Sequence, residues 1–194
     1  MSCTLKPFRD YDEHEVLNLF AFSGTIPVTK GHMVKVVGDG WQNAVADEHD
    51  GHWQMLGAPG GGLAPDNTVS QRYGVFNEST GKGSAVAIAG ADELPVGMML
   101  YDVKEEDENG EKLIYNPRKA AEMEVALSGQ AVPVLTRGVV LYDGSQLAVD
   151  DPAVGAALYT DSAGELTTTG STNVVGRVLG KKDADGNVLV KVLL

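Results

Sequence analysis

The residues best suited to metal chemistry lie close together in the segment DEHDGH, residues 47–52. His49 and His52 stand three positions apart among carboxylates. A zinc site needs three or four ligands in fixed geometry, and no second cluster of His or Cys accompanies this pair. His14 and His32 have no partners nearby in the sequence. We therefore interpret the segment as a solvated turn and expect no metal and no cofactor.

Two acidic segments place oxygen ligands at alternate positions, as calcium-binding loops do. They are EEDENGEK (105–112) and DADGN (183–187). In the second, a calcium loop would need Gly at the position of Val188 and Glu at the position of Leu194. Neither segment continues in the required way. We interpret both as hairpin tips, where charge and glycine discourage pairing between sheet edges.

Covalent catalysis and phosphate binding also lack their local signatures. In STGKGS (79–84), Phe76 occupies the position at which a phosphate loop requires its first glycine. No Gly-x-Ser-x-Gly elbow occurs, although a triad dispersed along the chain stays open because its members need not be adjacent. Carboxylates are plentiful enough to supply a glycosidase pair by accident. We expect a protein without enzymatic activity.

Composition narrows the class of partner. The chain of 194 residues has a formal net charge of −12, which argues against nucleic acid, since phosphate binding depends on clustered Lys and Arg. Cys3 is the only cysteine, so no intrachain disulfide can form. We find neither a run of about 18 apolar residues nor a basic, apolar leader, and expect no membrane partner and no signal peptide.

The elements that would position any site are mostly short strands. With 24 Gly and 8 Pro in spaced turn clusters, the chain favours strands over helices. In the final run, Val188, Val190, Val192 and Leu194 fall on one face of a strand, and DADGN supplies the turn of a closing hairpin. The other strands are expected within 25–41, 70–79, 84–90, 96–103, 112–116, 124–129, 131–144, 154–161 and 164–170.

We expect an all-β fold, a barrel or sandwich of short antiparallel strands with an extended N-terminal arm and at most one short helix. Residues 1–24 form the predicted arm and 25–194 the β domain, which could divide into two subdomains near 116–128. Val16, Asn18, Phe20 and Phe22 alternate as the arm leads into a strand. The helix is expected after Asn116 as its cap and Pro117 at its first position.

Four segments together resemble the head decoration proteins of tailed bacteriophages, also called cement or auxiliary capsid proteins. They are TRGVVLYDG, VGAALYTDSAGELTTTG, VVGRVLGKKDADGNVLVKVLL and the opening LKPFRDYDEHEVLNLFAFSG. The resemblance covers the two ends and about the last third of the chain. It implies a structural role: proteins of this kind sit on the outside of the assembled capsid, commonly as trimers at local threefold positions, and bridge neighbouring subunits.

From this resemblance we expect a virion protein made in the bacterial cytoplasm, with the major capsid protein and further copies of itself, as a homotrimer, for partners. The aromatic arm would contact the shell and the last strand would contact another copy, because apolar residues on both faces exceed what one small exposed sheet needs. The alternative is that the aromatic residues of the arm belong to a core strand and that both faces of the last strand are packed inside a single sandwich. Predicted shell contacts are Leu5, Phe8, Tyr11, Leu19 and Phe20. Predicted contacts between copies are Val188, Val190, Val192 and Leu194.

Two other classes of function stay open on the sequence. A carbohydrate-binding or host-adhesion module would use solvent-facing aromatic side chains to stack on sugar rings, and Trp41 and Trp53 are the candidates. A hydrolase would require several scattered Ser, His and Asp side chains to converge in the fold.

Overall fold

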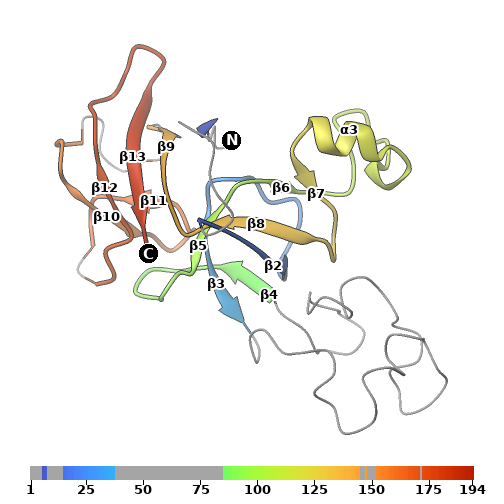
Figure 1. Ribbon diagram of the computed structural model, residues 1–194, viewed down its shortest axis with the longest axis horizontal. Helices are drawn as coiled ribbons and strands as arrows, with labels where there is room; N and C mark the ends of the chain where they lie inside the picture. The colour runs from blue at the N-terminus through green and yellow to red at the C-terminus, as the bar shows by residue number, and fades with distance from the viewer. Residues whose placement is uncertain (1–5, 8–14, 38–84, 145–146, 148–151, 171) are drawn as a thin grey trace, which may run out of the picture.

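The chain was analysed as a computed structural model, which describes residues 6–7, 15–37, 85–144, 147, 152–170 and 172–194. These residues form a closed barrel, a six-stranded sheet and a small lobe that contains the α-helix. Figure 1 places the sheet and the lobe at opposite ends, with the barrel between them. Within the described ranges the fold is all-β with one short α-helix, as the sequence predicted.

The barrel closes in the strand order β2-β4-β3-β5-β8. β2 and β4 are parallel, whereas the other neighbouring pairs of the barrel are antiparallel, so within the barrel the expectation of antiparallel strands holds with this exception. The last part of the predicted arm is β2, which lies in the barrel wall. The strands are β2 (Val16–Phe22), β3 (Met33–Val37), β4 (Ala85–Ile88), β5 (Gly97–Met99) and β8 (Ala131–Leu135).

The interior of the barrel is a core of aliphatic and aromatic side chains. Phe20 and Phe22 from β2 pack there with Val34, Val86 and Val132 from the neighbouring strands. Burial of this apolar surface drives closure, at roughly 25 cal/mol per Å² removed from water.

The second sheet has the strand order β1-β9-β13-β12-β10-β11, and all of its neighbouring strands are antiparallel. β9 and β13 pair over seven residues, from Arg137 opposite Leu193 to Asp143 opposite Asn187. The strands are β1 (Lys6–Pro7), β9 (Arg137–Asp143), β10 (Ala157–Thr160), β11 (Leu166–Thr167), β12 (Gly176–Val178) and β13 (Asn187–Leu193).

The closing hairpin predicted from the sequence is confirmed by the pairing of β12 with β13. At its tip the Asp183 carboxylate accepts hydrogen bonds from the backbone N–H groups of Asp185 and Asn187, at 3.0 and 2.7 Å. Gly186 adopts a φ of 86°, which glycine tolerates without strain. The DADGN segment is therefore a turn, as its composition indicated.

A second core joins the sheet to the barrel. The inward side chains of β9 and β13, among them Tyr142 and Val190, pack in one cluster with Met33, Met98 and Leu135 of the barrel. The backbone adds a direct link, because the Met33 N–H donates to the Gly164 carbonyl at 2.7 Å. The sheet and the barrel therefore share this second core.

Thr136 is the point at which the chain passes from the barrel to the sheet. Its backbone N–H and its hydroxyl both donate to the Glu15 carbonyl, at 2.9 and 3.0 Å. Its own carbonyl accepts from the Leu194 N–H at 3.1 Å. The start of β2 and the end of β13 are thus fastened to the same residue.

The lobe spans residues 102–127 and opens and closes with a short parallel pair, β6 (Asp102–Val103) and β7 (Val125–Ala126). Between them lie a 3₁₀ turn, η2 (Leu113–Tyr115), and α3 (Pro117–Glu122). The predicted helix is confirmed, with the Asn116 side chain accepting from the Lys119 N–H. The strand predicted at 112–116 is wrong: the Asn116 N–H bonds to the Leu113 carbonyl at 2.9 Å, which closes a helical turn.

Gly164 lies where the sheet packs tightly against the barrel, so a substitution there measures how much room this junction leaves. Its φ is +82°, and an added Cβ would overlap Ile88 Cγ2 and lie 3.2 Å from the Met33 carbonyl oxygen. Gly155 is a matched control, with a φ of +85° and no atom within 4 Å of an added Cβ. We expect Gly155→Ala to lower the free energy of unfolding by about 1 kcal/mol, for backbone strain alone.

Gly164→Ala is expected to cost about 1–3 kcal/mol more than Gly155→Ala, because it adds overpacking to the same backbone strain. Urea unfolding followed by circular dichroism measures both variants. Equal losses in the two variants would contradict the tight junction.

Candidate interaction surfaces

The sheet of β9, β13 and β12 turns one face to the core and the other to the surface. Along β13, Val188, Val190 and Val192 are buried, so the residues between them point the other way. We call this surface the outer face. It consists of Arg137, Val139, Leu141, Arg177, Leu179, Leu189, Lys191 and Leu193.

Cations and aliphatic side chains alternate across the outer face. The register places Lys191 between Val139 and Arg177, and Arg137 opposite Leu193. Directly opposed side chains in a sheet have Cβ atoms about 5 Å apart, so the like charges of Lys191 and Arg177 repel one another. Asp143 adds one carboxylate at the far end of β9.

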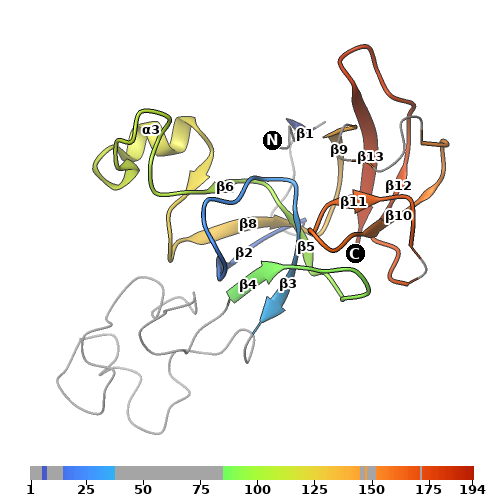
Figure 2. The ribbon, with the colours of Figure 1, turned by 180° about the vertical axis from the view of Figure 1, so that it is seen from behind.

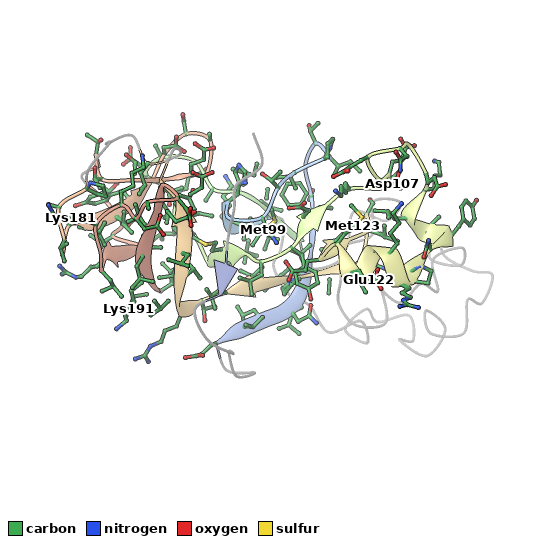
Figure 3. All side chains as sticks on the ribbon, turned by 90° about the horizontal axis from the view of Figure 1, so that it is seen from above. Met99, Asp107, Glu122, Met123, Lys181 and Lys191 are labelled. Carbon is green, nitrogen blue, oxygen red and sulfur yellow. The ribbon has the colours of Figure 1, made fainter. Side chains whose placement is uncertain are left out.

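Among the described residues, ion pairs leave most of the positive charge of this face unneutralised. Arg137 and Lys191 form no ion pair with any residue that the structure describes, and Arg177 donates only to the Gly155 carbonyl, at 3.4 Å. Figure 3 shows the Lys191 side chain projecting outward from the sheet. In a chain with a net charge of −12, three cations among leucines make a surface suited to an acidic, partly apolar partner.

The predicted contacts between copies divide between two environments. Val188, Val190 and Val192 pack inside the chain's own core, with at most 1% of their surface exposed, whereas Leu194 is 46% exposed. The side chains that β13 offers to a partner are those of the opposite face. Sequence reasoning missed Arg137 and Arg177 because only the cross-strand register places them beside β13.

The predicted shell contacts are likewise separated. Leu5, Phe8 and Tyr11 lie outside the described residues. Phe20 is 7% exposed and belongs to the barrel core, while Leu19 is 43% exposed. The register between β2 and β8 shifts between Leu17 and Phe20, and this bulge turns Asn18 and Leu19 to the surface together.

The lobe carries the most exposed aromatic side chain in the described part of the chain. Tyr115 is 85% exposed and its neighbour Ile114 is 65% exposed, both on η2. Leu113 anchors the turn from below, buried against Ala120 of α3 and Val125 of β7. A small core of its own therefore holds two large apolar side chains in water.

An ion pair fixes the loop that faces this turn. Asp107, whose side chain is 1% exposed, pairs with the Lys119 ammonium of α3 and accepts from the Asn109 and Glu111 N–H groups at 2.8 Å each. The Lys119 hydrogen bond, followed by that from Glu111, lowers the pKa of Asp107 from 3.8 to about 2. Glu106 and Lys112, on the two sides of the loop, form an antiparallel β-bridge with one another. Residues 105–112 are therefore a hairpin tip, as predicted.

A cavity of about 420 Å³ opens beside the same loop. Its walls are Ile26, Pro27, Lys104, Glu105, Glu106, Asp107 and Glu108. The lining is mainly acidic, yet no group of three or more His, Cys, Asp or Glu is placed to hold a metal ion in the described part of the chain.

No helix among the described residues is long and apolar enough to span a membrane. His49, His52, Trp41 and Trp53 lie outside the described residues.

Comparison with known proteins adds the family. Residues 8–194 match the family described as structural cement protein (E217 gp24/Pam3 gp6), a phage family. Neither the curated proteins nor the solved structures gave a match. The match covers nearly the whole chain, including the barrel, the lobe and every strand of the six-stranded sheet except β1.

The Asp107 carboxylate should control the order of the lobe. Because its pKa is lowered on folding, its stabilising effect is complete above the ordinary value of 3.8 and is lost as the pH falls toward 2. We expect the protection of the Asn109 and Glu111 amides from hydrogen exchange to fall over that range. Asp107→Asn, which removes the charge, should lower it already at pH 7.

Glu122→Gln is the control for this experiment. It removes the carboxylate of the exposed Arg118–Glu122 pair on α3, and pairs of this kind contribute only about 0.3–0.5 kcal/mol. It should leave the protection of both amides nearly unchanged. Similar loss of protection in the two variants would show that Asp107 has no special role.

Proposed function

The chain belongs to the phage structural cement protein family, and from that premise we propose that it binds the outer surface of an assembled capsid and links neighbouring capsid subunits. The observation that carries the proposal is the family match over residues 8–194. The partners in this proposal are the major capsid protein and other copies of the chain, arranged as a homotrimer. The role is structural and involves no chemical step.

We assign shell contact to the N-terminal segment and to the bulge of β2. Leu19 supplies an exposed apolar side chain there, and Phe20, buried in the barrel, holds the bulge in place. β1 pairs with β9, so the N-terminal segment runs along the edge of the sheet at Lys6 and Pro7. Leu5, Phe8 and Tyr11 flank this paired segment in the sequence and remain proposed contacts.

Stabilisation follows from mass action. A protein that binds the assembled shell but not its separated subunits adds its binding free energy to the shell at every occupied site. Contacts among neighbouring copies multiply the effect, since a bound copy raises the effective concentration of the next. Weak individual contacts are sufficient for this mechanism.

Co-sedimentation with empty, expanded shells that lack this protein tests the proposal. We expect saturable binding at a fixed ratio to the major capsid protein. Protein that stays in the supernatant at every concentration would contradict the proposed function.

Two substitutions on the bulge test the assigned contact. Leu19→Asp should weaken shell binding at least tenfold, because burial of a leucine contributes about 1.5–3 kcal/mol. Asn18→Asp places the same charge on the neighbouring exposed residue and should change binding by less than about threefold if Leu19 supplies apolar contact. Equal binding by the two variants would remove Leu19 from the interface.

A further inference from the structure

The two ends of the molecule carry complementary surfaces. Figures 1 and 2 show the lobe at one end and the β9–β13–β12 sheet at the other, seen from both sides. The outer face combines aliphatic side chains with Arg137, Arg177 and Lys191. The lobe combines Ile114 and Tyr115 with carboxylates.

The acidic character of the lobe remains after its internal ion pairs are considered. Residues 102–127 contain eight Asp and Glu against four Lys and Arg. Two of those cations, Arg118 and Lys119, are already paired within the lobe, and Lys30 from outside it pairs with Glu124. Of the five acidic side chains of the loop, Asp107 and Glu111 pair with Lys119, whereas no ion pair among the described residues engages Glu105, Glu106 or Glu108.

These carboxylates belong to a loop whose backbone contacts the start of η2, the turn that carries the exposed apolar pair. The Leu113 N–H donates to the Glu105 carbonyl at 2.9 Å, and Glu106 bridges to Lys112, so the acidic loop runs alongside η2. The lobe thus carries an exposed tyrosine and isoleucine on a turn that adjoins an acidic loop. A surface complementary to the lobe would combine aliphatic side chains with positive charge. The outer face has this composition.

We propose that the lobe of one copy docks on the outer face of a second copy of the same chain. Because the two surfaces lie at opposite ends, one copy cannot join its own lobe to its own face. The contact is therefore head-to-tail. In a closed ring of such contacts, the lobe and the outer face of every copy are both occupied, whereas an open chain leaves one of each free at its ends. A ring of three satisfies the proposed homotrimer. This inference rests on the self-association in the proposed function and does not depend on binding to the shell.

The structure of the lobe is suited to this role. Asp107 and Lys119 lock the loop to α3, and Leu113 fixes η2 to the small core beneath it. Tyr115 is therefore presented on a support that is ordered before any partner arrives, which lowers the entropic cost of association. Tyrosine is also among the residues that most often dominate binding at protein interfaces.

Sedimentation velocity of the full chain without shells tests the proposal, from about 1 μM to 1 mM, the range typical of weak association. We expect concentration-dependent assembly of the wild-type protein. Tyr115→Asp on the lobe and Lys191→Glu on the outer face should each weaken assembly at least tenfold. Leu193→Asp provides a second variant of the face, and Leu94→Asp, at an exposed leucine outside both surfaces, should assemble like the wild type.

Mixing the variants identifies the type of contact. Tyr115→Asp keeps an intact face and Lys191→Glu keeps an intact lobe, so an equimolar mixture should form a one-to-one dimer, although neither variant assembles alone. A wild-type protein that is monomeric throughout the range, variants that assemble normally, or a mixture that stays monomeric would each overturn the proposal.

Binding of the same variants to shells separates this inference from the proposed function. If the wild type stays monomeric in solution, or the variants assemble like it, yet the protein binds shells saturably, only the head-to-tail contact is wrong. If the wild type assembles and the variants do not, but no protein binds shells, the proposed function fails and the head-to-tail contact stands. Unchanged circular dichroism spectra would exclude misfolding of the exposed substitutions as the cause.

Discussion

The seven-residue pairing of β9 with β13 is the constraint on which the rest of the structure depends. Its register directs Val140, Tyr142, Val188 and Val190 to the shared core, and their neighbours to the outer face. A shift by one residue would exchange the two sets and place cations in the core. The core and the proposed contact surface are therefore two consequences of one pairing, and the link at Thr136 fixes both to the barrel.

Local patterns in the sequence were enough to predict several elements. Alternation in the last strand, the Asp-Gly turn at its start and the Asn116–Pro117 cap each predicted the element that the structure contains. Such features depend on side chains within a few positions of one another. The same kind of local evidence gave a wrong prediction for 112–116. Leu113 and Ile114 favour a strand by their local preference, but the packing of Leu113 against α3 decides for a helical turn.

Other features depend on contacts between distant segments and could not be predicted. The alternation within Val16–Phe22 predicted a strand at the end of the arm, but not its pairing with β8 and β4 in the barrel wall. The bulge that exposes Leu19 arises from the register with β8. Likewise, only cross-strand pairing places Arg177 opposite Lys191 and Arg137 opposite Leu193. The composition of the outer face is thus encoded in the topology.

The family assigns a structural role to a fold whose described residues hold separate surfaces at fixed places. A cement protein must make the shell more durable, and the most direct measurement is the temperature at which empty, expanded shells come apart, followed by light scattering as the protein is titrated. Our account predicts that this temperature rises with protein concentration and levels off when the sites are filled. A temperature that stays constant while the protein is demonstrably bound would contradict it.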